Sequence, residues 1–238
     1  MYKRIILKLS GETLAPERLE GAKSPTFDAA RVEAVARVIA ELAGMGVQVG
    51  VVMGGGNIWR GRFTEEMDAV NADQMGMLAT VINALAVEDA LRRLGTKATV
   101  FTAQEMNRFA RLYTARDAAQ CMEEGGVALL AGGTGNPFFT TDTGAALRAA
   151  ELGADAVFKG TTVEGVYDSD PRKNPDAKLI RDISYREAVT RGLRVMDLTA
   201  FMLCMERNVP VVRVFSMENL GNILRVAAGE DLGTTVHA

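Results

Sequence analysis

Four short glycine-containing segments carry the residues best suited to chemistry, because each could hold a phosphate group. They are Lys8-Leu9-Ser10-Gly11, Gly54-Gly55-Gly56-Asn57 with Arg60 close behind, Gly132-Gly133-Thr134-Gly135-Asn136, and Lys159-Gly160-Thr161-Thr162. Glycine lacks a Cβ, so nearby backbone N–H groups can approach an anion closely, and lysine and arginine add full positive charges. One such segment alone is more simply read as a tight turn. Together they indicate a site for a polyphosphate, or for two phosphorylated ligands placed end to end.

Common phosphate-binding motifs are absent from the sequence. Gly21-Ala22-Lys23-Ser24 has the end of a P-loop, but it lacks the first glycine and does not follow a predicted strand. No G-x-G-x-x-G opens a helix after the first predicted strand, and the protein-kinase motifs are missing. The sequence therefore argues against a P-loop enzyme, a common dinucleotide-binding fold and a protein kinase.

Lys8 is unusual because it lies within an apolar first strand. A lysine there must be paired or point into a polar cleft, unless the strand lies at a sheet edge and the lysine serves solubility. Ser10-Gly11 directly after it favours the cleft. Asp73 and Asp170, taken alone, have simpler readings as a helix cap and a turn residue.

Alternating strands and helices must position these segments. Strands are predicted at 3–9, 47–53, 97–102, 127–131, 155–159, 210–215 and 234–237. Helices are predicted at 28–43, 73–94, 114–124, 142–152, 198–207 and 217–228, and Ser184-x-x-Glu187 is expected to open a further short helix. This order predicts an α/β fold, a three-layer αβα sandwich with a mostly parallel central sheet. Ligands of such sheets bind at the carboxyl ends of the strands, where the four segments lie.

The chain is predicted to be a single domain, residues 1–238, with one lobe at roughly 1–150 and another at roughly 151–238. Residues 160–182 contain Pro171 and Pro175 and are read as an excursion or a hairpin. The helix at 73–94 is predicted to turn one apolar face inward, and its members are Met77, Leu78, Val81, Ile82, Leu85 and Leu91.

Composition excludes several classes of protein. Net charge is −3, which argues against a broad basic surface for nucleic acid, and no apolar stretch is long enough to span a membrane. His237 is the single histidine, which argues against a metal site built from several histidines and against a histidine-based catalytic triad. Cys121 and Cys204 are expected to be free thiols, which fits a cytoplasmic protein.

Taken together, the motifs resemble those of the amino-acid kinase superfamily, and within it those of the bacterial uridylate (UMP) kinases. The resemblance spans nearly the whole chain, and its most specific part is the run at 133–142. The matching segments are Lys8-Leu9-Ser10-Gly11-Glu12, the stretch 48–57 with Arg60-Gly61, Asp73-Gln74-Met75-Gly76-Met77-Leu78-Ala79-Thr80, Gly133-Thr134-Gly135-Asn136-Pro137-Phe138-Phe139-Thr140-Thr141-Asp142, Gly165-Val166-Tyr167-Asp168-Ser169-Asp170-Pro171 and Val195-Met196-Asp197.

The resemblance implies phosphoryl transfer from Mg·ATP to UMP, a step of pyrimidine nucleotide biosynthesis. It implies catalytic roles for Lys8 and Arg60, with Mg²⁺ carried by ATP rather than by the protein. The implied ATP-binding residues are Lys8, Leu9, Ser10, Gly11, Gly56, Arg60, Thr161, Tyr167 and Asp170. The implied UMP-binding residues are Gly55, Asp73, Thr134, Gly135, Asn136, Pro137, Phe138, Phe139, Thr140 and Thr141.

The resemblance also implies a cytoplasmic homohexamer built from dimers, under allosteric control and without nucleic-acid or membrane partners. The helix at 73–94 is a candidate interface, although burial within one chain explains its apolar face equally well. Residues 15–28 depart from the pattern of family members that respond to GTP. Those members usually have a glycine-containing stretch where this chain has Pro25-Thr26, so the sequence does not predict activation by GTP. Asp197 either organises the site or only caps a helix.

Two other functions compete with this one. A related enzyme of the same fold could phosphorylate a carboxylate, a carbamate or a lipid phosphate, and fold alone would not separate these reactions. A non-catalytic nucleotide-binding protein is the second alternative. The run at 133–142 favours UMP as the acceptor, and the presence of both Lys8 and Arg60 favours catalysis.

Overall fold

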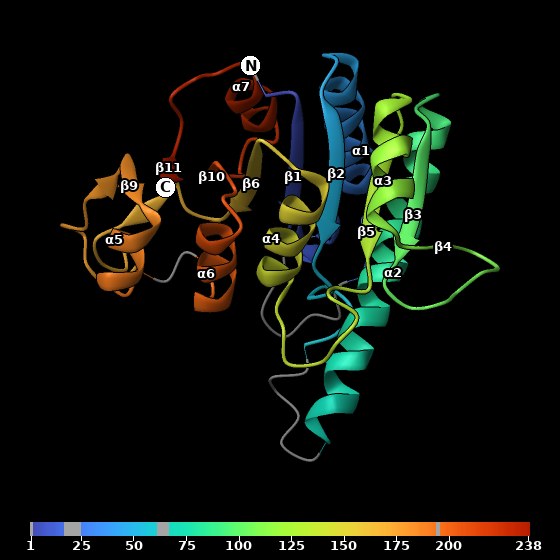
Figure 1. Ribbon diagram of the computed structural model, residues 1–238, viewed down its shortest axis with the longest axis horizontal. Coiled ribbons are helices and arrows are strands. Elements are labelled where there is room, and N and C mark those ends of the chain that lie inside the picture. Colours follow the sequence, from blue (N-terminus) through green and yellow to red (C-terminus); the bar gives the residue numbers. More distant parts are fainter. Residues whose placement is uncertain (1, 17–24, 61–66, 194–195) are drawn as a thin grey trace.

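The computed structural model describes residues 2–16, 25–60, 67–193 and 196–238 (Figure 1). Within these ranges the chain forms one large sheet with helices on both faces, so the predicted three-layer α/β architecture is confirmed. Gly21-Ala22-Lys23-Ser24, Gly61, Val195 and residues 17–24 of the stretch 15–28 lie outside the described residues.

The main sheet of the described residues has nine strands in the order β4-β3-β5-β2-β1-β6-β10-β11-β9. Neighbouring strands are parallel except β10 and β11, which are antiparallel. Its strands are β1 (Arg4–Leu9), β2 (Gln48–Met53), β3 (Ala98–Thr102), β4 (Arg111–Leu112), β5 (Val127–Ala131), β6 (Ala156–Thr161), β9 (Asp182–Ser184), β10 (Val211–Ser216) and β11 (Thr234–His237). The predicted excursion holds a separate antiparallel hairpin of β7 (Val166–Tyr167) and β8 (Leu179–Ile180).

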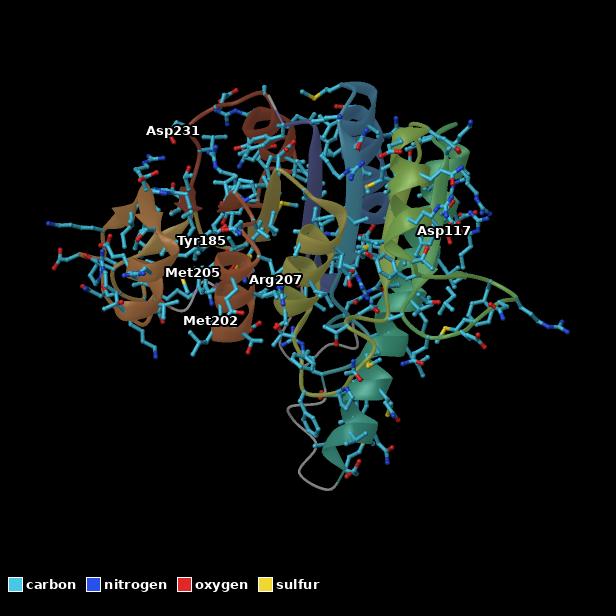
Figure 2. The ribbon with its side chains drawn as sticks, viewed as in Figure 1. Asp117, Tyr185, Met202, Met205, Arg207 and Asp231 are labelled. Carbon is cyan, nitrogen blue, oxygen red and sulfur yellow. The ribbon has the colours of Figure 1, made fainter. Side chains whose placement is uncertain are left out.

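Each face of the sheet has its own hydrophobic core. One core involves α1 (Ala29–Gly44), α2 (Ala69–Arg93) and α7 (Asn222–Ala227), and the other α3 (Ala115–Glu123), α4 (Thr141–Leu152), α5 (Tyr185–Thr190) and α6 (Leu198–Glu206). Successive side chains of central strand β1 alternate between the two cores, as a strand requires. Tyr185, labelled in Figure 2, packs edge-on against Phe201 in the second core and donates its hydroxyl to the carbonyl of Val209.

The register of β1 brings two lysines side by side at the centre of the sheet. Lys8 pairs with Val52 of β2 on one side and with Lys159 of β6 on the other. Residues paired across parallel strands point to the same face, and Ile6, two residues earlier, lies in the core beneath α3 to α6. Both lysines therefore lie on that face, at the carboxyl ends of their strands.

Side-chain caps fix where the helices begin. Asp28, Thr114, Ser184 and Asp197 accept backbone N–H groups at the first turns of α1, α3, α5 and α6, as their positions in the sequence predict. Asp68 caps α2 by accepting the Asn71 N–H at 3.0 Å, so this helix begins earlier than predicted. Asp73 therefore lies within α2 rather than at its start.

Two further expectations about helices are wrong. Leu78 and Ile82 of α2 are 49% and 48% exposed, because only part of the apolar face of this helix meets the sheet. α7 begins at Asn222 rather than 217, because Ser216 and Asn219 accept the N–H groups of Glu218 and Gly221 and form local turns instead. Strands β4 and β9 and the short 3₁₀ helix η1 (Gly11–Leu14) are not predicted at all.

The N-terminal part of α2 extends past the carboxyl ends of the strands (Figure 1). The connection between β5 and α4 lies at the same end, so the two enclose space there. Among the described residues, no helix combines the length and the apolar character needed to cross a membrane.

Candidate active site

Two pockets open at the carboxyl end of the sheet. The first has a volume of about 620 Å³ and lies between the segment after β2, the N-terminal half of α2 and the β5–α4 connection. The second, of about 470 Å³, lies between the end of β6, the β7–β8 hairpin and residues 191–193. Two pockets of this size suit two separate ligands.

A charged cluster of Lys8, Asp142 and Lys159 lies between the pockets. Lys159 lines the second pocket, and Asp142 follows directly on Thr140 and Thr141, which line the first. The Lys8 Nζ is 2.9 Å from the Asp142 Oδ1, an ion pair without hydrogen-bond geometry, and the Lys159 Nζ donates to the Asp142 Oδ2. The side chains are only 12–14% exposed, so these charges interact with little screening by solvent.

Burial and charge act against each other in this cluster. Burial raises the pKa of the Asp142 carboxyl, but the two ammonium groups outweigh it, and the net pKa lies below its usual value. Burial lowers the pKa of the Lys159 ammonium, and Asp142 does not fully offset this, especially with Lys8 adjacent. Asp142 therefore stays ionised at neutral pH, while Lys159 gives up its proton more readily than an ordinary lysine.

Asp197 links α6 to the first turn of α4. Its carboxylate accepts the Ala200 N–H at 2.9 Å, which caps α6, and it also accepts the hydroxyl groups of Thr140 and Thr143. Thr140 in turn caps α4 by accepting the N–H groups of Asp142 and Thr143. Of the two roles open to Asp197 from sequence, it performs the cap and also holds the residues on either side of Asp142.

The glycines after β1 and β2 have different reasons to be glycine. A Cβ on Gly11 would lie 2.3 Å from the Asn57 Oδ1, and one on Gly55 would lie 2.8 Å from the Ala79 Cβ, so packing forbids both. A Cβ on Gly56 would meet only the Glu12 Oε1, at 3.7 Å. Packing among the described residues therefore does not require glycine at 56.

Arg60 and Asp73 contribute opposite charges to the first pocket. Arg60 pairs with Glu12 and donates its Nε–H to the Gly56 carbonyl at 3.1 Å, so its guanidinium is tied to the glycine segment. The Asp73 Oδ2 accepts the Phe138 N–H at 2.6 Å. That contact holds Phe138, whose φ of +71° is uncommon for a residue with a side chain.

The structure places most residues implied to bind UMP around the first pocket. Gly55, Asp73, Asn136, Phe138, Phe139, Thr140 and Thr141 line it, together with Arg60. Gly135 and Pro137 instead line a neighbouring, mainly apolar pocket of about 330 Å³. Thr134 uses its hydroxyl within the connection, where it accepts the Asn136 N–H at 3.2 Å.

The residues implied to bind ATP divide into three groups, one of which is Arg60 alone, in the lining of the first pocket. Thr161, Tyr167 and Asp170 line the second pocket. Lys8, Leu9, Ser10, Gly11 and Gly56 belong to the described lining of neither large pocket. The Leu9 side chain is fully buried, so only its backbone is available, and the Ser10 side chain begins η1 by accepting the Glu12 N–H.

Sequence reasoning misses Asp142 as a site residue and treats Lys159 only as a nearby cation. From sequence, Asp142 looks like any carboxylate in the first turn of a helix, because the two lysines that it contacts are distant in sequence. Lys159, like Lys8, lies in an apolar strand, where a lysine must be paired or point into a polar cleft. Applying that argument to Lys159 as well would have identified it as a site residue. Trp59 also lines the first pocket, and it donates its indole N–H to the Ala72 carbonyl at 2.9 Å.

The chain is similar to known kinases over its whole length. The uridylate kinases of Bacteroides thetaiotaomicron and Parabacteroides distasonis are each 50% identical to it over 238 residues, which cover 99% of this chain and 98% of each relative. The crystal structure of UMP kinase from Bacillus anthracis has a TM-score of 0.92 at 35% identity, covering 99% of this chain and 96% of that one. UMP kinase from Ureaplasma parvum has a TM-score of 0.90 at 35% identity, with full coverage of both chains.

A family model agrees with these likenesses. The model of the amino acid kinase family matches residues 3–215, which contain both pockets and the charged cluster between them. The chain belongs to the amino acid kinase family.

Proposed function

We propose that this protein is a uridylate kinase, which transfers the γ-phosphoryl group of Mg·ATP to UMP and yields UDP and ADP in pyrimidine nucleotide biosynthesis. The observation that carries the proposal is the Lys8–Asp142–Lys159 cluster between two ligand-sized pockets. UMP occupies the pocket beside α2, in the lobe formed by roughly 1–150. ATP occupies the pocket beside the β7–β8 hairpin, in the lobe formed by roughly 151–238.

The reaction needs charge neutralisation and alignment rather than a protein nucleophile. A phosphate oxygen of UMP forms a bond to the γ-phosphorus, and the bond to the oxygen bridging the β- and γ-phosphates breaks, leaving ADP. Negative charge on the transferred group is spread over its oxygens, so fixed cations in a partly buried site stabilise the transition state. Lys8 and Lys159 supply these cations, and Asp142 holds both in place. Arg60 supplies a third cation beside the glycine segment.

Magnesium enters as part of the Mg·ATP substrate. Among the described residues, no three His, Cys, Asp or Glu side chains are grouped to hold a metal ion. Mg²⁺ usually keeps several waters and is bound by one or two carboxylates together with the phosphates of the nucleotide.

Asp73→Asn tests the acceptor pocket. Asp73 Oδ2 is already taken by the Phe138 N–H, so its other oxygen is the one available to accept a hydrogen bond from the UMP ribose. We expect Asp73→Asn to weaken UMP binding by roughly tenfold, since the charged acceptor is lost, with ATP affinity nearly unchanged. Calorimetric titration of each nucleotide measures both affinities. Equal losses for both ligands would contradict the placement of UMP.

The function itself is tested by ADP formation from Mg·ATP with UMP, CMP, dTMP, N-acetylglutamate and carbamate as parallel acceptors. We expect turnover with UMP and its loss when Mg²⁺ is chelated. Turnover of N-acetylglutamate or carbamate without UMP would identify a carboxylate or carbamate kinase of the same fold. Nucleotide binding without turnover of any acceptor would identify a non-catalytic protein.

We further propose that the chain is cytoplasmic and assembles as a homohexamer built from dimers. Cys121 and Cys204 are free thiols, which suits a reducing compartment. Met75, Leu78 and Ile82 of α2 are between 39% and 49% exposed, so this helix retains apolar surface that a second copy could cover. Sedimentation velocity of the wild type and of a Leu78→Glu variant measures whether α2 is an interface, and an unchanged hexamer would exclude it.

A further inference from the structure

The local sequence of the β5–α4 connection, residues 132–136, does not determine its backbone conformation. Gly132, Gly133 and Gly135 have φ values of +76°, +59° and +88°, in the left-handed region. Glycine adopts positive and negative φ about equally readily, so glycines this close together carry little conformational preference. Contacts from outside the connection must therefore choose the conformation that faces the acceptor pocket.

Side chains from separate parts of the fold make these contacts. The Thr80 Oγ1 accepts the Gly132 N–H at 2.9 Å, and the Gln104 Nε2 donates to the Gly135 carbonyl at 2.8 Å. Between them, the Arg148 Nη2 donates to the Gly133 carbonyl at 3.1 Å. The backbone is thus held on both sides of Thr134.

Arg148 is the most constrained of these side chains. The residue is 5% exposed, and its guanidinium lies 3.8 Å from the centre of the Tyr113 ring. Its Nη1 donates to the Glu151 Oε2 at 2.7 Å, and the Tyr113 hydroxyl donates to the same oxygen at 2.7 Å. Burial, with Glu151 adding to it, raises the pKa of Tyr113, so the hydroxyl keeps its proton and remains a donor. The Tyr113 ring and the Glu151 carboxylate together hold the guanidinium in place.

The orientation of the guanidinium has a direct effect on the connection. A buried cation is costly unless it is paired, and an ion pair between residues of one helix turn does not require burial. Here the guanidinium is buried with one arm directed away from its carboxylate, onto the Gly133 carbonyl. In a trans peptide the carbonyl and the following N–H point in opposite directions. The contact therefore fixes where the Thr134 N–H points.

We propose that Arg148, held by Tyr113 and Glu151, is a positioning residue that sets the affinity for the acceptor nucleotide by fixing the peptide between Gly133 and Thr134. The inference rests on the proposed function, because it takes the first pocket to be the UMP site. Arg148 is not among the residues that line the first pocket. It acts through the backbone of the connection that lines the pocket.

Arg148→Met tests this proposal, because methionine keeps much of the length and apolar contact but has no donor. We expect the KM for UMP, and its calorimetric Kd, to rise roughly tenfold, the scale for loss of a charge-assisted hydrogen bond. The KM for ATP is expected to stay nearly unchanged. Arg148→Lys keeps a charged donor without the planar fork, so it is expected to recover part of the UMP affinity.

Arg213→Met is the matched control. Arg213 is also buried, at 7% exposed, and also donates to backbone carbonyls, those of Glu230 and Leu232, but it lies on β10 away from the connection. We expect it to lower the Tm while leaving the KM for UMP nearly unchanged. A purely structural Arg148 would behave in the same way as Arg213.

A second variant keeps the proposal testable if Arg148→Met does not fold. Tyr113→Leu removes the ring beneath the guanidinium but leaves the N–H donors of Arg148 in place. The KM for UMP is therefore expected to rise less than in Arg148→Met. An unchanged KM for UMP in folded Arg148→Met, or in both Arg148→Lys and Tyr113→Leu, overturns the proposal about Arg148. If the wild type still phosphorylates UMP, the proposed function stands. Failure of the wild type to bind or phosphorylate UMP overturns both.

Discussion

Replacing Lys8 by alanine is expected to lower kcat for transfer to UMP by about two orders of magnitude or more, the scale for one lost charge contact in a transition state. The Lys8 ammonium lies in the partly buried cluster between the two pockets, with its side chain 13% exposed. Solvent screens the ammonium weakly there, so its interaction with the transferred phosphoryl group is strong, and water does not make up for its loss. Steady-state kinetics with Mg·ATP and UMP measures the effect.

Lys3→Ala is the matched control for this experiment, because Lys3 lies just before the same strand and is exposed. It is expected to leave kcat unchanged. The KM values for both substrates should change less than kcat in Lys8→Ala, since the charge matters most when the phosphoryl group is in transit. A wild-type kcat in Lys8→Ala would remove Lys8 from the mechanism.

Asp142→Asn is expected to lower both stability and kcat. The substitution keeps the shape of the side chain but leaves the ammonium groups of Lys8 and Lys159 facing each other without an anion. Removing one partner from a buried ion pair costs about 3 kcal/mol or more. We expect a loss of this size in the free energy of unfolding at neutral pH. We also expect kcat to fall by about tenfold or more, because Lys159 sheds its proton to relieve the repulsion.

The pH dependence of Asp142→Asn separates this explanation from simple misfolding. The pKa of Lys159 is already lowered by burial and should fall further without Asp142. Between this folded pKa and the ordinary lysine value, the unfolded chain binds more protons, so stability rises with pH. The deficit of the variant in urea unfolding should therefore shrink as the pH rises from neutral toward the ordinary pKa of lysine. Exposed Asp176→Asn should show no such dependence, and a deficit independent of pH would refute the role given to Asp142.

The central part of the fold could be predicted from sequence because its signals are local. Apolar strands followed by glycine segments gave the parallel sheet and the edge where ligands bind. Lys8 stood out because a lysine in a central apolar strand is costly without a partner. Caps such as Asp28 and Thr114 could be read from their neighbours alone.

What could not be predicted depends on contacts between distant residues. Asp142 reads as a first-turn carboxylate until β1 and β6 bring two lysines beside it. Arg148 reads as an ordinary helix residue until the fold places Tyr113 and the Gly133 carbonyl around it. The exposure of Leu78 and Ile82 has the same origin, because periodicity shows that a face is apolar but not what covers it.

The pairing of Lys8 with Lys159 across β1 and β6 has a consequence for how this enzyme can evolve. Adjacent strands are held about 4.8 Å apart by their backbone hydrogen bonds, so the spacing of the two lysine Cα atoms is set by the sheet and not by loops. Loops around the pockets can lengthen, shorten or exchange residues without altering that spacing. A single-residue insertion or deletion within β1, by contrast, would send Lys8 to the opposite face of the sheet. We expect natural length variation among relatives to avoid β1 and β6 and to accumulate in the connections.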